Sequence, residues 1–425
     1  MKEDAILQML KKEMVPALGC TDPVGIAYAA AHAKKYARGE IQSIFLELSP
    51  NIIKNASAVC IPNTQGRCGI PLAAALGAIG GTEEKKLEVF SGITEEHVER
   101  ALELLVRGGV TVKVSEEGEK LFIHLILVTE QDRVEVVIQD SYTNVLGLSV
   151  NQPLQRSPAN HEPKGAGEGA HSFLSLSRIV SFAEKVSLEK LDVIHQAIDW
   201  NMAIAEEGLK NEYGISVGRN IQKFMEKGVL AEDMANWAMM WVAAATDARM
   251  AGVNLPVMSN TGSGNQGLAS TVPVISVAEK TGVSREKMVR AVTISSLVTI
   301  YIKNRLGELS AVCGAIIAAA GTACGVVYLL EGTEQDMLAA LKSVLGDVAG
   351  MVCDGAKAGC SMKVTTCTQA AVLSAVLATA GKGIQGTDGI VDHEEEKTID
   401  NFIRMATEGM GNMDRVLLDI ITKKC

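Results

Sequence analysis

The stretch KLFIHLILVTEQDRVEVVIQD, residues 120–140, decides how the first part of this chain folds. Both of its halves are rich in β-branched and other large apolar residues, which is typical of strands. Glu130-Gln131-Asp132 separates the halves and supplies a tight turn. IQSIFLELS (41–49) and VTVKV (110–114) have the same strand character, and Val alternates with polar residues in the second of them. The sequence therefore predicts an antiparallel meander.

Helical patterns lie beside these strands and dominate the rest of the chain. ITEEHVERALELLVRGG (93–109) has helical spacing, an N-cap at Thr94 and glycines at its end. QPLQRSPANHEPKGAGEG (152–169) holds three prolines and three glycines, and predicts a linker or a long active-site loop. Most of the chain after residue 169 has patterns typical of helices, some of them apolar nearly all round.

The expected fold class is therefore α+β. Residues 1–158 should form an N-terminal antiparallel sheet with helices, which carries Cys20. Residues 159–425 should form a large, mostly helical domain, which carries the cysteines of the C-terminal half. We expect the active site where the two parts meet.

The composition excludes several classes of function. The net charge of −10 argues against a nucleic-acid partner, because little would neutralise phosphates. The first residues lack the uninterrupted apolar stretch of a signal peptide, which favours the cytoplasm. Residues 311–330 carry no charge but are rich in Ala and Gly, without flanking basic clusters or aromatic belts. They predict a buried core helix and not a membrane span. The expected partner is a small substrate, and a homo-oligomer is left open.

Nine cysteines in a chain without a secretory signal are poorly explained by disulfides. Reduced thiols usually hold a soft metal or react. Cys353 and Cys360 would lie roughly 10 Å apart along one straight helix, but Gly355 and Gly359 allow a loop that brings them together. Cys313 would come from a neighbouring helix. Three thiols suit an iron–sulfur cluster, and buried structural thiols are the equal alternative. Zinc is disfavoured because no CxxC pair exists.

Four short motifs, spread along the whole chain, carry a resemblance to a known family: GCTDP (19–23), SNTGSGNQG (259–267), AVCGA (311–315) and CDGAKAGC (353–360). Together they resemble the L-cysteine desulfidase family, which is related to the α-subunit of iron–sulfur L-serine dehydratases. The resemblance implies a 4Fe-4S cluster held by Cys313, Cys353 and Cys360. It also places Cys20 in the active site, as a base or as a fourth, displaceable contact.

The implied reaction suits these residue types. A cluster with three thiolate ligands leaves one iron open as a Lewis acid for a departing sulfide or hydroxide. Thr21, Asp22 and Pro23 resemble a helix start, where backbone N–H groups lower the pKa of a thiol such as Cys20. Elimination then yields an enamine, which hydrolyses to pyruvate and ammonia. The expected function is L-cysteine desulfidation, with L-serine dehydration on the same cluster as the nearest alternative.

Substrate contacts are expected from Thr21 and Asp22, and from the polar glycine-rich motif of the mid-chain. In that motif glycines allow close approach of the backbone, while Asn260, Thr261, Ser263 and Asn265 offer donors to a carboxylate. An ordinary helix N-cap loop is the alternative. Lys303 is a further candidate to neutralise a carboxylate, although a cation at a helix C-terminus also complements the helix dipole.

Other functions remain open from the sequence. The glycine-rich motif also looks like the substrate loop of pyridoxal-phosphate dehydratases, whose Schiff-base lysine would have to be Lys223 or Lys227. A non-catalytic cluster or thiol redox sensor is another class, and a membrane carrier built on residues 311–330 is a third. In related L-serine dehydratases a C-terminal cysteine can fold back to the cluster, and Cys425 is the corresponding hypothesis here.

Overall fold

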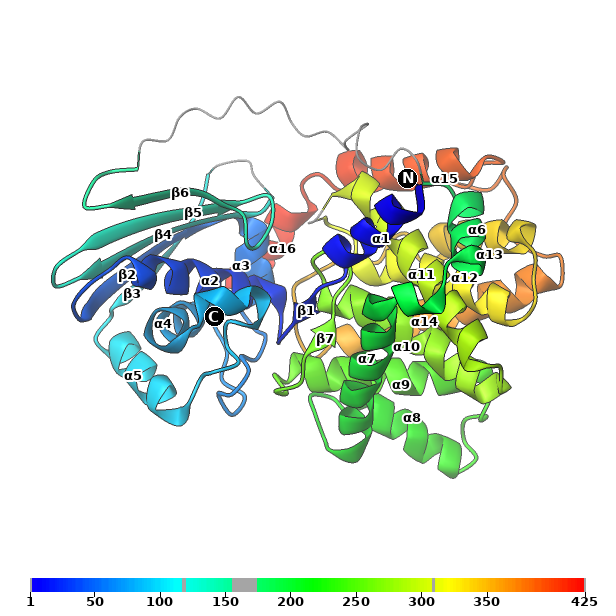
Figure 1. Cartoon of the computed structure of the whole chain (residues 1–425), viewed down its shortest axis with the longest axis horizontal. Coiled ribbons are helices and arrows are strands. Elements are labelled where there is room, and N and C mark those ends of the chain that lie inside the picture. Colours follow the sequence, from blue (N-terminus) through cyan, green and yellow to red (C-terminus); the bar gives the residue numbers. More distant parts are fainter. Residues whose placement is uncertain (1, 117–119, 155–173, 308–309, 424–425) are drawn as a thin grey trace.

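The computed structural model describes residues 2–116, 120–154, 174–307 and 310–423 of the chain. A twisted sheet with helices lies on one side of the molecule, and a larger body made of helices lies on the other (Figure 1). This arrangement confirms the expected α+β class. The boundary expected at residue 158 falls outside the described residues and stays a prediction.

Five strands form the sheet of the first part: β2 (Ile41–Leu48), β3 (Val110–Val114), β4 (Phe122–Thr129), β5 (Arg133–Gln139) and β6 (Val145–Val150). Their spatial order is β3-β2-β4-β5-β6. The β4–β5 hairpin confirms the turn predicted from the sequence, and β6 extends the meander. One pairing differs from the expectation, because β2 and β3 are parallel. The connection between them is long and helical, as parallel neighbours require.

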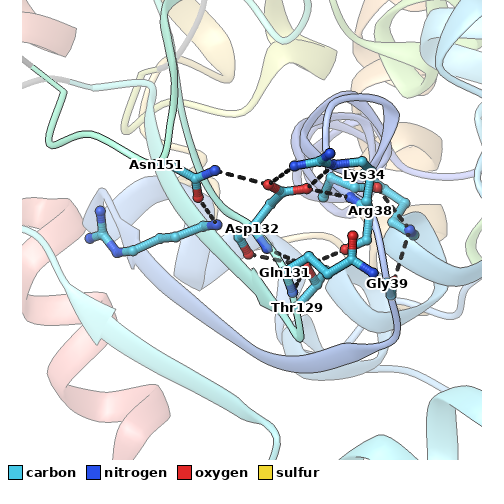
Figure 2. A network of polar contacts seen from close by, with 9 residues as sticks. Lys34, Arg38, Gly39, Thr129, Gln131, Asp132 and Asn151 are labelled. Atoms are coloured by element: carbon cyan, nitrogen blue, oxygen red, sulfur yellow. Dashed lines mark hydrogen bonds and ion pairs between the residues drawn. The ribbon is translucent and has the colours of Figure 1, made fainter.

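The turn of the β4–β5 hairpin is held by a buried carboxylate. Figure 2 shows Asp132 between Arg38, which follows the helix α2 (Thr21–Lys35), and Asn151, which follows β6. Arg38 donates from Nε and Nη2 to the two carboxylate oxygens at 2.9 Å, and Asn151 donates to Oδ1 at 2.8 Å. These hydrogen bonds hold the pKa of Asp132 well below its usual range. The turn is thereby tied to two other segments of the sheet layer.

The helices of the first part are α2 (Thr21–Lys35), α3 (Pro50–Ala56), α4 (Ile70–Gly80), the short 3-10 turn η1 (Glu83–Glu88) and α5 (Glu95–Val106). Thr94 caps α5 as predicted, since its hydroxyl accepts from the His97 N–H at 3.4 Å. α2 and α4 approach closely because Gly77 faces the backbone of Ala27, where a Cβ would lie 2.3 Å from the Ala27 oxygen.

The helical body contains α6 (Leu176–Lys185), η2 (Leu188–Lys190), α7 (Asp192–Lys210), α8 (Val217–Glu226), α9 (Met234–Met250), α10 (Gly264–Thr281), α11 (Arg285–Leu306), α12 (Gly314–Leu329), α13 (Glu334–Asp347), α14 (Cys360–Thr379), α15 (Glu395–Arg404) and η3 (Met405–Gly409). The central helix, α12, packs against α10, α11, α13 and α14. Its burial confirms the core helix predicted for residues 311–330. In the described ranges, none of the helices combines the length and apolarity needed to cross a membrane.

The two parts exchange segments at their junction. α1 (Lys2–Glu13) packs into the core of the helical body, and β1 (Pro16–Ala17) pairs with β7 (Val257–Met258). In return α16 (Met413–Thr422) packs on α3, where the buried Lys54 ammonium lies 2.6 Å from Asp414 Oδ1. These exchanges fix the junction, where the candidate site lies.

Candidate active site

A pocket with a cavity volume of about 120 Å³ lies at the junction of the two parts. Ten of the eleven residues singled out from the sequence line it: Cys20, Thr21, Asp22, Thr261, Ser263, Asn265, Lys303, Cys313, Cys353 and Cys360. The fold therefore gathers residues separated by up to 340 positions in the chain. The chemistry that each of them can support depends on its contacts and its burial.

Asn260 is the candidate that the structure places behind the wall of the pocket. Its side chain is fully buried, donates to the Ser296 carbonyl oxygen at 3.2 Å, and accepts from the Thr261 hydroxyl at 2.7 Å. Gln266 donates to the same Thr261 hydroxyl oxygen at 2.8 Å. Asn260 and Gln266 thus hold Thr261, which has a left-handed backbone with φ of 45°.

Four helix N-termini meet at this pocket. Cys20 occupies the N-cap of α2, Ser263 the N-cap of α10 and Cys313 the N-cap of α12, while Cys360 is the first residue of α14. The Ser263 hydroxyl accepts from the Gln266 N–H at 3.3 Å, so the N-cap interpretation of the glycine-rich motif is confirmed. N-termini carry partial positive charge. Their convergence favours anionic groups in the pocket, either substrate carboxylates or thiolates.

Cys313 and Cys353 are neighbours because the residues before them pair. Val312 and Val352 form an isolated antiparallel bridge. The Cys313 N–H donates to the Met351 carbonyl oxygen at 2.9 Å, beside this bridge. The two thiols therefore reach the same pocket from segments that are forty residues apart in the chain.

Gly355 forms the turn that brings Cys360 into the pocket with Cys313 and Cys353. Its φ of 97° is in the left-handed region, and a Cβ there would lie 2.3 Å from the Lys54 carbonyl oxygen. Only glycine fits this turn without displacing the backbone of α3. Gly359 has ordinary right-handed angles, so Gly355 alone provides the glycine-dependent break that the sequence predicted between the two cysteines. α14 can then begin at Cys360.

The thiols fit a soft metal by their chemistry. Burial, and then the charge of Cys353, raises the pKa of Cys313 to about 12. Burial also raises the pKa of Cys360, against the opposing effect of its hydrogen bond from Lys357 and of the Lys363 charge. Buried thiolates without a cation are therefore costly here, and a bound metal would offset that cost. Within the described ranges, however, no cluster of three or more His, Cys, Asp or Glu side chains is close enough to hold a metal ion.

Asp22 is the centre of a buried polar network. Tyr142 donates to Asp22 Oδ1 at 3.0 Å and Asn55 donates to the same oxygen at 3.1 Å, while the Cys20 thiol lies 3.7 Å from Oδ2. Burial raises the pKa of Asp22 to about 6, although these hydrogen bonds oppose the rise. Burial, and then the charge of Asp22, raises the pKa of Cys20 well above its usual value. The lowered Cys20 pKa expected from the helix start is therefore wrong, since burial outweighs the helix dipole.

Arg249, on α9, is a pocket residue that the sequence motifs did not indicate. Its side chain is buried, with Nη1 donating to Asn265 Oδ1 and Nη2 donating to the Gly19 carbonyl oxygen, both at 2.7 Å. Its Nε has no acceptor among the described residues. A signal was present, because Asp247 and Arg249 interrupt the apolar run WVAAATDARM, where an exposed charge would be out of place. Tyr142, which lines the pocket from the end of the sheet, was also missed.

The lysines separate the candidate chemistries. Lys303 is buried in the last turn of α11 and lines the pocket. Arg305 forms ion pairs with Glu396 and Asp400 and does not line the pocket. Lys223 and Lys227, the candidates for a pyridoxal-phosphate Schiff base, are exposed on and just after α8 and do not line the pocket. Cys425 lies outside the described residues.

Known proteins resemble this chain along nearly all of its length. The family described as serine dehydratase alpha chain matches residues 84–419. A UPF0597 protein of Oleidesulfovibrio alaskensis is 40% identical over 418 residues, which cover 98% of this chain and 97% of that protein. UPF0597 proteins of Actinobacillus pleuropneumoniae and Photobacterium profundum are 38% identical over 423 residues, covering 99% of this chain and 98% and 99% of theirs. The chain therefore belongs to the serine dehydratase alpha chain family, which implies a lyase of the dehydratase type.

Proposed function

We propose that this protein is an iron–sulfur-dependent lyase that eliminates sulfide from L-cysteine and yields pyruvate and ammonia. The observation that carries the proposal is the composition of one pocket, where the thiols of Cys313, Cys353 and Cys360 face the same cavity as the buried Arg249 guanidinium. Dehydration of L-serine at the same site is the second candidate, and membership of the serine dehydratase alpha chain family favours it.

Cys313, Cys353 and Cys360 are the residues proposed to hold a 4Fe-4S cluster. Thiolates are the usual ligands of such clusters, and the raised pKa values of Cys313 and Cys360 mean that a cation must accompany their ionised forms. When bound, the cluster supplies a Lewis-acid iron for the leaving sulfide or hydroxide. The N-termini of α12 and α14 carry two of these thiols and stabilise their negative charge.

Arg249 is the residue proposed to bind the substrate carboxylate. A buried guanidinium without a carboxylate partner is costly, and an incoming carboxylate would offset that cost. No ion pair joins Arg249 to an acidic side chain among the described residues, and its Nε lacks an acceptor. Asn265 orients Nη1 through its Oδ1. Thr261, Ser263 and Lys303 line the same cavity and complete a polar wall with the N-terminus of α10.

Cys20 and Asp22 are proposed to handle the α-proton of the substrate. The Cys20 thiol has Asp22 Oδ2 as its proton acceptor, at 3.7 Å. Tyr142 and Asn55 orient the Asp22 carboxylate through its other oxygen. The positive charge of Arg249 lowers the pKa of Cys20 and so opposes the effect of burial. Asp22 and Arg249 therefore both act on the Cys20 thiol. Cys20 would pass its own proton to Asp22 Oδ2 and, as the thiolate, take the α-proton of the substrate, which Thr21 would flank.

The chemistry of the leaving group separates the two candidate substrates. Soft thiolate surroundings favour sulfur over oxygen, although the preference is slight. The test uses anaerobically purified protein with L-cysteine and L-serine in parallel, and measures pyruvate, ammonia and sulfide. Desulfidation predicts equal amounts of sulfide and pyruvate from L-cysteine, with a kcat/KM above that for L-serine. Turnover of L-serine alone would make the protein a dehydratase.

Failure to turn over either amino acid would favour the non-catalytic alternative, a cluster or thiol redox sensor. The pyridoxal-phosphate alternative is not supported, because Lys223 and Lys227, the candidates for its Schiff-base lysine, are exposed and do not line the pocket. We also predict a cytoplasmic location and a small amino acid as the partner, while a homo-oligomer stays an open alternative.

A further inference from the structure

A second pair of thiols lies outside the pocket, in the hairpin of residues 60–68. Cys60 and Cys68 are both free, and neither lines the pocket. The two residues face each other as an isolated antiparallel bridge pair. The Ile61 N–H donates to the Arg67 carbonyl oxygen at 2.9 Å, directly inside this pair. That hydrogen bond marks Cys60 and Cys68 as a non-hydrogen-bonded pair of the antiparallel ladder.

This kind of pair suits a disulfide. Directly opposed residues of a non-hydrogen-bonded antiparallel pair have Cα atoms about 4.5 Å apart, and their side chains lie on one face. Disulfides join Cα atoms about 4.4–6.8 Å apart. Cys60 and Cys68 can therefore be bridged without a change of backbone register.

The turn between the two cysteines holds them opposite each other. Thr64 Oγ1 lies 2.7 Å from the Ile61 carbonyl oxygen and 3.1 Å from that of Arg67. The Arg67 guanidinium donates back to the Thr64 carbonyl oxygen at 3.0 Å. Asn63 and Gln65 have left-handed backbones, with φ of 62° and 56°, which reverse the chain. The hairpin is thus closed by its own side chains, and the register of the pair does not depend on a disulfide.

The two thiols differ in access. Cys68 is exposed, whereas Cys60 is half-buried. Burial, and then the charge of Cys68, raises the pKa of Cys60. A thiol that is more buried and less ionised reacts more slowly with a solute. Cys68 is therefore the thiol that a soluble reagent meets first, and Cys60 is placed to react with it afterwards.

We propose that Cys60 and Cys68 form a redox-active dithiol site whose co-reactant is a low-molecular-weight disulfide. The Cys68 thiolate attacks one sulfur of that disulfide, breaks its S–S bond and releases one small thiolate. The Cys60 thiolate then attacks the Cys68 sulfur, forms the Cys60–Cys68 bond and releases the second small thiolate. Two electrons pass from the protein thiols to the small disulfide, and the two thiol protons end on the two released thiols.

The hairpin also supports a wall of the pocket. A Cβ on Gly19, the residue before Cys20, would lie 2.7 Å from Pro62 Cγ. Val59, next to Cys60, is buried in one cluster with Cys20 and Met250. The dithiol site is therefore separate from the pocket thiols, yet it lies one layer of residues behind them.

The test treats the reduced, full-length protein with oxidised glutathione under anaerobic conditions, blocks the remaining thiols by alkylation and maps tryptic peptides by mass. Trypsin cleaves after Lys54, Arg67 and Lys85, so Cys60 and Cys68 fall in separate peptides, 55–67 and 68–85. The expected product is these two peptides joined, with the sum of their masses less two hydrogens. A wild-type protein that ends with glutathione on Cys68 and an alkylated Cys60 would overturn the proposal.

Two single variants sharpen the result. Cys60→Ser should stop the reaction at a stable mixed disulfide between Cys68 and glutathione. Cys68→Ser should slow the modification of Cys60 by about tenfold or more, because the exposed thiol is gone. Identical products from wild type and Cys60→Ser would contradict the exchange. The readout needs no amino-acid turnover, so its failure is distinguishable from failure of the proposed lyase function.

Discussion

Arg249 Nη2 donates a 2.7 Å hydrogen bond to the carbonyl oxygen of Gly19, the residue that precedes Cys20. This bond joins α9 of the helical body to the start of α2 in the sheet layer. A Cβ on Gly264 would lie 2.4 Å from Arg249 Nε, so the start of α10 packs directly on the same guanidinium. The buried Arg249 guanidinium therefore links the start of α2, where the proposed base Cys20 lies, with the start of α10, which lines the proposed substrate site.

Arg249→Lys should weaken substrate binding. Lysine keeps the positive charge but loses the planar fork that bonds Asn265 and Gly19 together. We expect kcat/KM for L-cysteine to fall by roughly 30- to 1000-fold, mainly through KM, which corresponds to about 2–4 kcal/mol. Steady-state kinetics on both amino acids measures this. Arg305→Lys is the matched control, because Arg305 pairs with Glu396 and Asp400 away from the pocket. Equal losses of kcat/KM in the two variants would contradict the proposal that Arg249 binds the substrate carboxylate.

Cys353→Ala should abolish iron binding and activity together. Removal of one proposed ligand should lower iron content, the absorbance at about 400 nm and turnover, the last by more than about 100-fold. Cys324→Ala is the control, since Cys324 is buried in α12 with its thiol near the Met337 carbonyl oxygen at 3.6 Å. It should keep iron and activity. Full iron occupancy in purified Cys353→Ala would contradict the proposed ligand set.

Gly355→Ala should destabilise the loop between Cys353 and Cys360. The added Cβ would lie 2.3 Å from the Lys54 carbonyl oxygen on a backbone with φ of 97°. We expect the free energy of unfolding to fall by about 2–4 kcal/mol, with a loss of iron binding. Gly350→Ala serves as the control, because a Cβ there meets no described atom within 4 Å, and it should change stability by less than about 0.5 kcal/mol. Urea unfolding compares them, and equal stabilities would refute the role of Gly355.

Most helices and strands of the fold could be predicted from short-range sequence patterns. The β4–β5 hairpin and the Thr94 cap depend on residues close together in the chain, and periodicity or capping chemistry predicts them. The parallel pairing of β2 with β3 depends on a helical connection of about sixty residues, and no local pattern reports its return direction.

The candidate site was predictable to the extent that its chemistry is visible in motifs. The cysteines and the glycine-rich motif can be recognised in the sequence by their residue types, and the fold brings them to one pocket. Arg249 lies inside an otherwise ordinary helix, so its role emerges only when Gly19 and Asn265 surround it. The pKa of Cys20 was expected in the wrong direction because tertiary burial, which the sequence does not express, exceeds the effect of the helix start.

Glu395→Gln should stabilise the protein in a pH-dependent way. Burial, and then the charge of Glu396, raises the pKa of Glu395 from 4.5 to about 7. As the pH rises between these values, the unfolded chain releases this proton first, so the free energy of unfolding of the wild type falls. The variant should therefore gain about 1–3 kcal/mol at pH 8, and the gain should vanish near pH 4.

Urea unfolding at several pH values measures this difference. Glu99→Gln, at an exposed position of α5, is the control and should show no pH-dependent gain. A gain for Glu395→Gln that is as large at pH 4 as at pH 8 would show that its origin is not the raised pKa of this carboxyl group.

The most direct test of the proposed function is an anaerobic purification with a visible spectrum, iron and sulfide quantitation, and addition of L-cysteine to the same cuvette. A lyase that uses Cys313, Cys353 and Cys360 as ligands predicts a broad absorption at about 400 nm that oxygen bleaches, together with release of sulfide and pyruvate. A colourless, iron-free protein that turns over neither L-cysteine nor L-serine under strict anaerobic conditions would contradict the proposal.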